Sequence, residues 1–183
     1  MMYKIIIFLS LSILSANPFI PSNGQEINYT QVFFKWPPIP QINEYQLKIF
    51  EDGQNEELFI GYSEFNSLLV ENILSWDNSY IWEVCGIESY SNLCLDQNYF
   101  TINPLPEYHP DEIHITSYNE NFYQQGINIL DFESLGYSLA LDKSGNTIWF
   151  SDKNNFHNSK IISGELLNNG NFTGFSDGRG YEF

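Results

Sequence analysis

The sequence predicts an all-β protein, in which an antiparallel sandwich is followed by a second unit built from β-hairpins. Strand-forming Tyr, Phe and Ile and turn-forming Asn are abundant, whereas Ala is scarce. Short apolar or alternating runs recur along the chain with Gly, Pro and Asn between them. Hydrophobic residues make up 43% of the chain and aromatic residues 17%, which is the composition of a folded protein rather than a disordered one.

The charge balance excludes one large class of partners. The 183 residues include 7 Lys and Arg against 23 Asp and Glu, which gives a net charge of −16. Such a surface repels phosphate backbones and anionic lipid headgroups. We therefore expect no nucleic-acid partner.

The N-terminus has the pattern of a secretory signal peptide. Lys4 precedes an apolar stretch at residues 5–14, and small residues follow at Ser15 and Ala16. We expect a signal peptide at residues 1–16, with cleavage as late as residue 24. The apolar stretch is shorter than the roughly 20 residues of a membrane span. The sequence thus predicts a secreted or periplasmic protein with no membrane span.

Six short strands are predicted in the first unit. Residues 45–50 and 80–85 alternate with period two, and Pro37 and Pro38 end the apolar run at 32–36. Antiparallel sandwiches show strands of this length and spacing. The predicted strands are residues 32–36, 45–50, 58–62, 67–70, 80–85 and 99–102.

The two cysteines predict a disulfide. Cys85 and Cys94 flank a stretch rich in Tyr, Ser and Asn, and an exported protein meets oxidising conditions. A metal site is disfavoured, because neither a CxxC nor an HxxxH spacing supplies further ligands. A nucleophilic cysteine is disfavoured as well, because no His lies nearby in the sequence.

Residues 26–103 resemble a fibronectin type III domain. The resemblance rests on Trp36 before two prolines, on the alternating strand at residues 45–49, and on Leu74 followed by Tyr80-x-Trp82-x-Val84. It implies that the Tyr80 hydroxyl returns to the backbone near Leu74 or Ser75. On strands of alternating pattern, Trp36 and Trp82 are expected in the core rather than on an exposed sugar-binding platform.

Residues 104–125 read as an extended acidic connector that contains Pro104, Pro106 and Pro110. His109 and His114 are five residues apart, a spacing that places them on neither one helix face nor one strand face. We therefore expect linker histidines that face solvent, and no shared metal.

The last part, residues 126–183, predicts repeated hairpins. Strands are expected at residues 127–132, 136–142 and 147–151, with a turn at 143–146, and again at 161–167 and 172–175 around a turn at 168–171. Hairpins that repeat with a Gly-Asn turn are typical of β-propeller blades.

This part is similar to the beginning of the propeller in the arylsulfotransferases, the bacterial aryl-sulfate sulfotransferases. Many of these enzymes carry a small β-sandwich ahead of the propeller. The resemblance implies that residues 126–183 form the first blade of an incomplete β-propeller. The matching positions are Gly136, Asp142, Gly145, Trp149, Leu167, Asn169, Gly170 and Asn171.

The resemblance implies an activity but assigns no catalytic residue. The family transfers a sulfuryl group from a phenolic sulfate ester to a phenol or alcohol through a histidine intermediate, without a cofactor. His109, His114, His157 and Arg179 match no catalytic motif, so the chain is expected to be an inactive N-terminal fragment of the enzyme.

A different class of function stays open. A secreted fibronectin type III-like binding or adhesion module would also be exported, rich in aromatic residues and without a catalytic set. Asn28 and Asn171 begin N-glycosylation sequons, which matter only in a eukaryotic secretory route. Sequence downstream of Phe183 would distinguish the two classes.

Overall fold

The structure is a computed structural model that describes residues 19–87, 92–107, 109, 128–132, 137–151, 162–166, 172–176 and 179–182. These residues form strands and turns without a helix, so the prediction of an all-β protein is confirmed. The predicted signal peptide, His114, His157 and the turn at residues 168–171 lie outside the described residues.

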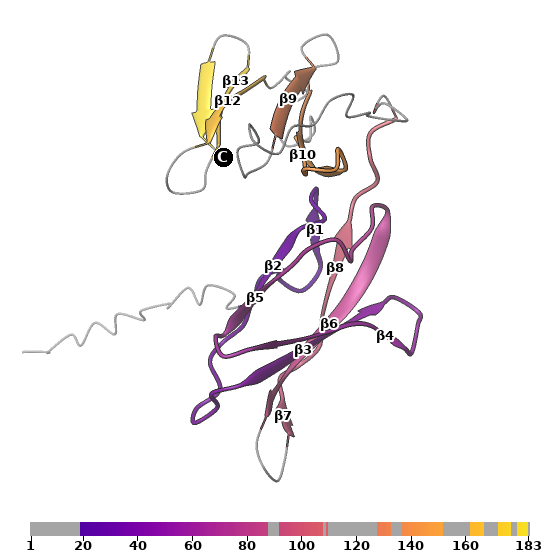
Figure 1. Cartoon of the computed structure of the whole chain (residues 1–183), viewed down its shortest axis with the longest axis vertical. Helices are drawn as coiled ribbons and strands as arrows, with labels where there is room; N and C mark the ends of the chain where they lie inside the picture. Colours follow the sequence, from indigo (N-terminus) through magenta and orange to yellow (C-terminus); the bar gives the residue numbers. More distant parts are fainter. Residues whose placement is uncertain are drawn as a thin grey trace, which may run out of the picture.

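The first unit consists of two facing sheets (Figure 1). The larger sheet has the strand order β1-β8-β6-β3-β4, with β7 beside β6, and the smaller sheet pairs β2 with β5. All pairs are antiparallel except β1 with β8. The strands are β1 (Gln25–Ile27), β2 (Val32–Lys35), β3 (Tyr45–Glu51), β4 (Glu57–Ser63), β5 (Ser67–Val70), β6 (Asn78–Ile87), β7 (Asn92–Cys94) and β8 (Asn98–Ile102).

All six strands predicted for this unit are present. The structure adds β1 and β7, which have only three residues each. Neither is long enough to show an alternating pattern in the sequence. They are strands because β8 and β6 offer them backbone partners.

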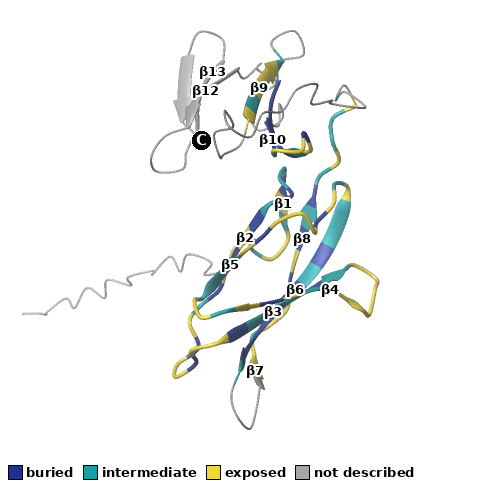
Figure 2. Cartoon of the chain, in the orientation of Figure 1, coloured by how far each residue is buried: buried dark blue, intermediate teal, exposed yellow. Residues whose placement is uncertain are grey.

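Figure 2 shows buried residues along the strands of both sheets, and aromatic side chains among them form much of the core. Trp36 and Trp82 are 1% and 0% exposed, so the prediction that they belong to the core is confirmed. The Phe34 ring meets Trp82 edge to face at 5.2 Å and Phe100 at 5.7 Å. Such pairs add to the hydrophobic gain from burial, and they tie β2 of the small sheet to β6 and β8 of the large one.

The Tyr80 hydroxyl forms two hydrogen bonds with the backbone of the loop before β6. It accepts a hydrogen bond from the backbone N–H of Ser75 at 2.8 Å and donates one to the Ser75 carbonyl at 3.3 Å. This is the contact that the sequence predicts. It holds the turn that precedes β6 against the body of the sandwich.

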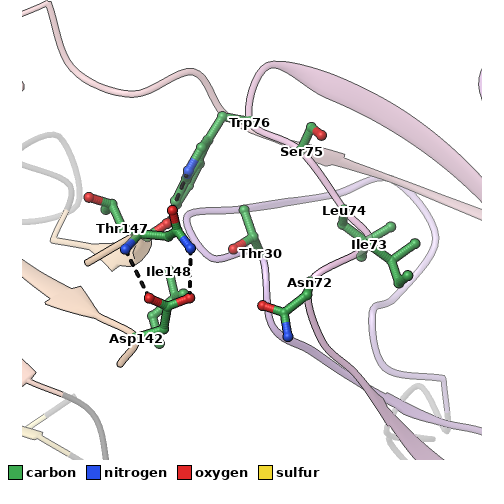
Figure 3. Close-up of a pocket in the computed structure, with 10 residues that line it drawn as sticks. Thr30, Asn72, Ile73, Leu74, Ser75, Trp76, Asp142, Thr147 and Ile148 are labelled. Carbon is green, nitrogen blue, oxygen red and sulfur yellow. Dashed lines mark hydrogen bonds between the residues drawn. The ribbon is translucent and has the colours of Figure 1, made fainter. Parts of the chain in front are cut away.

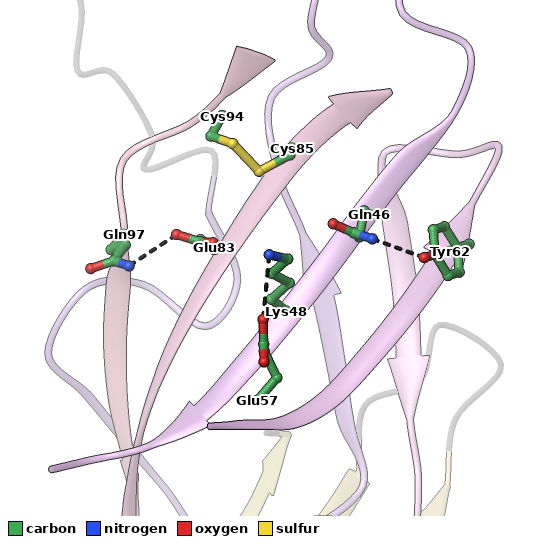
Figure 4. Close-up of polar contacts among 8 residues, drawn as sticks. All are labelled: Gln46, Lys48, Glu57, Tyr62, Glu83, Cys85, Cys94 and Gln97. Atoms are coloured by element: carbon green, nitrogen blue, oxygen red, sulfur yellow. Dashed lines mark hydrogen bonds and ion pairs between the residues drawn. A yellow bond between two sulfur atoms is a disulfide. The ribbon is translucent and has the colours of Figure 1, made fainter. Parts of the chain in front are cut away.

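The disulfide joins Cys85 of β6 to Cys94 of β7, as predicted. The two residues face each other across the β6–β7 pair, and the bond lies at the outer face of the large sheet (Figure 4). A disulfide is compatible with an extracellular or periplasmic protein.

The second unit contains two three-stranded antiparallel sheets. The first has the order β11-β10-β9 and the second the order β12-β13-β14. Both predicted hairpins are confirmed, and β14 continues the second sheet beyond the predicted strands. The strands are β9 (Asn128–Phe132), β10 (Tyr137–Leu141), β11 (Thr147–Phe150), β12 (Ile162–Leu166), β13 (Phe172–Ser176) and β14 (Arg179–Glu182).

We expect Tyr80→Phe to lower the free energy of unfolding by about 1–2 kcal/mol, because the Ser75 N–H loses its acceptor in a partly buried place. Urea denaturation measures the change. Tyr99→Phe is the matched control, since this ring is 53% exposed, and it should stay within about 0.5 kcal/mol of wild type. Equal losses for the two variants would contradict a structural role for the Tyr80 hydroxyl.

Candidate functional site

The sandwich and the first hairpin sheet meet at a joint, which consists of residues 28–30 and Trp76 on one side and β11 on the other. Residues 28–30, which follow β1, run antiparallel to β11. Thr30 N–H donates to the Ile148 carbonyl at 3.0 Å, and Phe150 N–H donates to the Asn28 carbonyl at 3.1 Å. Between these bonds, Tyr29 stands opposite Trp149. Residues 28–30 of the sandwich thereby form a short antiparallel bridge along the edge of the β11-β10-β9 sheet.

Trp76 is the side chain shared by the two units. Its indole Nε1–H donates to the Thr147 carbonyl at 3.3 Å, and its ring lies 5.4 Å from that of Phe150. It packs against the core of the sandwich and also against the apolar cluster of the hairpin sheet. Removing it would therefore expose apolar surface on both sides of the joint.

The apolar cluster of the hairpin sheet is centred on β10. All five residues of β10 are buried, in contrast to the mostly exposed β9. A strand that is buried on both faces needs cover on each side. The cluster consists of Tyr137, Leu139, Leu141 and Phe150, with Trp76, Leu105 and Phe132 packed against it.

The beginning of the connector lies against this sheet. Leu105 packs on the apolar cluster, and His109 Nε2 is 2.8 Å from the Thr147 hydroxyl. His109 is half-buried, which differs from the expectation of a histidine that faces solvent. The reason is that the connector turns back onto the hairpin sheet at this point.

An open groove of about 320 Å³ runs along the joint (Figure 3). One wall is the loop before β6, and the other is the β10–β11 hairpin with its turn. The lining residues are Thr30, Asn72, Ile73, Leu74, Ser75, Trp76, Asp142, Asn146, Thr147 and Ile148. Its polar groups are hydroxyls, amides and one carboxylate.

The Asp142 carboxylate in this groove accepts hydrogen bonds from residues of its own turn. Oδ1 accepts from the backbone N–H groups of Ser144 at 2.8 Å and Asn146 at 2.9 Å, and Oδ2 accepts from Asn146 Nδ2 at 2.9 Å. Partial burial alone would raise the pKa of Asp142, but the Asn146 side chain and the turn N–H groups outweigh it and lower the pKa.

Glycine is required at position 145 of this turn. Gly145 has φ +87°, a left-handed conformation that other residues rarely adopt. Asp142 and Gly145, two positions that carry the resemblance to the sulfotransferases, thus shape the hairpin. A carboxylate held ionised by three donors is a poor general base.

The described residues bring together few groups with catalytic chemistry. They contain no group of three or more His, Cys, Asp or Glu side chains that could hold a metal ion. Nor do they form any helix with the length and hydrophobicity of a membrane span. The groove offers hydroxyls, amides and one carboxylate that is already bonded within its own turn.

Sequence reasoning missed the joint residues Tyr29, Trp76 and Thr147. The available signal was the place of Trp76, a large apolar side chain in the turn between β5 and β6 with no periodic pattern around it. An aromatic residue in such a loop needs a surface to cover, and here that surface belongs to the second unit.

Comparison with protein-family models finds no match to the chain, and a search of curated proteins finds no significant relative.

We expect Trp76→Ala to lower the free energy of unfolding by about 2–3 kcal/mol, less than for a fully buried Trp, because apolar contacts on both units are lost. Chemical denaturation checks this. Phe33→Ala, which removes a ring that is 48% exposed on β2, is the control and should cost no more than about 0.5 kcal/mol. A Trp76→Ala loss as small as that of the control would show that the joint is not stabilising.

Because Tyr29 lies in the joint, we expect the folding stability to depend on pH in the alkaline range. Burial raises the pKa of the Tyr29 hydroxyl above its ordinary 10.0. The folded state therefore holds this proton longer than the unfolded state, and stability should fall as the pH rises from about 10 through the folded-state pKa. Tyr29→Phe should flatten this alkaline limb in denaturation curves measured against pH. Superimposable limbs for the two proteins would contradict the assignment.

Proposed function

We propose that this chain is the N-terminal part of a secreted enzyme similar to the arylsulfotransferases, in which a fibronectin type III-like sandwich supports the first blade of a β-propeller. The observation that carries the proposal is the bridge between residues 28–30 and β11, which places a fourth, short segment at the edge of a three-stranded hairpin sheet. Propeller blades are four-stranded antiparallel sheets.

Features of the sandwich support a secreted protein with a fibronectin type III-like domain. Its strand order and the bond between Tyr80 and the backbone of Ser75 are typical of the immunoglobulin-like class, to which fibronectin type III domains belong. The disulfide fits export. Phe19 lies 5.8 Å from Trp82 as part of the sandwich, which favours signal cleavage after Ala16 over cleavage after Gly24.

The second hairpin sheet is evidence that the same three-stranded unit repeats along the chain. The β12-β13-β14 sheet follows the first at once in the chain, has the same up-and-down antiparallel order, and lies against it through β9 and β10. Two similar sheets in succession are the pattern of consecutive blades. Blade strands further along the parent protein would complete the ring.

In the proposed enzyme, the donor is a phenolic sulfate ester and the acceptor a phenol or alcohol. The bond from sulfur to the phenolic oxygen breaks as a histidine nitrogen bonds to sulfur, and the acceptor oxygen then takes the sulfuryl group as the histidine is released. We assign no described residue to this chemistry. The role of the sandwich is to position the first blade.

The test is a transfer assay with a chromogenic phenyl sulfate as donor and phenol as acceptor. The 183-residue chain should release no coloured phenol, whereas a protein extended by the in-frame codons after Phe183 should transfer the sulfuryl group. Turnover by the 183-residue chain would contradict the assignment of catalysis to the missing blades. An extension with no further blade strands would refute the enzyme proposal itself.

A second candidate is a binding or adhesion module. It is favoured by the tyrosine rings on the outer face of the large sheet, where Tyr62 and Tyr99 are 57% and 53% exposed. Exposed aromatic rings on a flat sheet are suited to glycans or to a partner protein. Further sandwich modules after Phe183, in place of blades, would favour this function.

A further inference from the structure

Within the part of the chain that the structure describes, β4 pairs with β3 alone, so that its other edge is open. The sheet ends on one side with β1, which has three residues, and on the other with β4, which has seven. Soluble proteins usually blunt their edges with short strands, prolines or charged side chains. The β1 edge is blunted by its length, but the β4 edge is not.

The side chains of β4 are unusually apolar for an edge. Its residues are ELFIGYS, so that Glu57 is the only charged one. Lys48 on the neighbouring strand pairs with Glu57 at 3.5 Å. Leu58, Ile60 and Tyr62 are 42%, 44% and 57% exposed. The edge thus presents open backbone groups and apolar side chains between exposed carboxylates, since Glu56 precedes the strand and Glu64 follows it.

The edge is also held in a fixed shape. The Tyr62 hydroxyl accepts a hydrogen bond from Gln46 Nε2 at 2.9 Å, and Figure 4 shows this pair beside Lys48 and Glu57 on adjacent strands. On the inner face, Gly61 lets β4 approach β5, since a Cβ at this position would lie 2.6 Å from Leu68 Cδ2. A preformed edge loses little conformational freedom when another strand joins it.

We propose that β4 pairs antiparallel with β4 of a second copy of this chain, around a two-fold axis at Ile60. Such a two-fold interface requires a segment that is complementary to itself. The axis sets Ile60 opposite its own copy and Leu58 opposite the second copy's Tyr62, so that apolar side chains meet apolar ones. Glu57 falls opposite Ser63, and Glu56 falls opposite the second copy's Glu64, so that all the carboxylates lie at the two ends of the pair.

The charge of the chain sets the conditions for this pairing. Two copies at −16 each repel one another, but at physiological salt the screening length is about 8 Å and distant charges contribute little. Because the centre of the contact is apolar and the carboxylates of Glu56 and Glu64 repel one another at its ends, association should strengthen as salt is added. An interface built on ion pairs would weaken instead.

Sedimentation of the exported chain over a concentration series tests the proposal. We expect a reversible dimer whose dissociation constant falls with added salt and rises at least tenfold in Ile60→Lys. Phe33→Lys, an equally exposed apolar residue on the outer face of β2, is the control and should leave the dimer intact. A chain that stays monomeric up to near-millimolar concentration at high salt would overturn the proposal.

A cysteine at the axis tests the register and does not depend on the folding of a charged variant. Residues directly opposite each other in an antiparallel pair have Cα atoms about 4.5–5.5 Å apart, within reach of a disulfide. Ile60→Cys should therefore form a covalent dimer under mild oxidation, whereas Phe33→Cys should not. Equal cross-linking at the two positions would overturn the pairing, and a dimer that Ile60→Lys leaves unchanged would place the contact elsewhere.

Discussion

The antiparallel pairing of residues 28–30 with β11 is the interaction on which the arrangement of the two units depends. After β1 pairs with β8, the chain leaves the large sheet at Ile27, whose carbonyl accepts from Asn103 N–H at 3.0 Å. The next three residues lie along β11 before β2 begins the small sheet. One short segment therefore belongs to the sandwich by sequence and to the hairpin sheet by hydrogen bonding. It also protects β11 from being an exposed edge.

Side-chain packing makes this backbone pairing specific. Two or three hydrogen bonds at a surface contribute little net free energy, because water would satisfy the same groups. Trp76 changes the balance, since it shields the pairing from water and joins the apolar clusters of both units. The tyrosine at position 80 holds Ser75, the residue next to Trp76, so the core of the sandwich helps to position the joint. The Asp142 turn shapes the opposite wall in the same way, from bonds within one hairpin.

The elements were readable from the sequence where local patterns are strong. Alternation of apolar residues predicted β3 and β6, the Lys143–Asn146 turn predicted the β10–β11 hairpin, and the Tyr80 contact followed from the resemblance to a known domain. The three-residue strands β1 and β7 were not predictable, because a short strand is defined by its partner. The joint was not predictable either: Tyr29 and Trp149 are 120 positions apart, and the sequence contains no signal for the long-range contact between them. The expectation that His109 faces solvent was wrong for the same reason, since it rested on the local spacing of His109 and His114 and not on a long-range contact.

The sandwich and the first hairpin sheet form one structure through the bridge between residues 28–30 and β11. Hydrogen exchange at two backbone amides tests it most directly, because Thr30 N–H and Phe150 N–H are the donors that cross the joint. The account predicts that both amides are protected and that they exchange with a common opening free energy, as groups broken by a single event do. It is contradicted if both amides exchange at the rate of unstructured backbone while the amides of β6 remain protected.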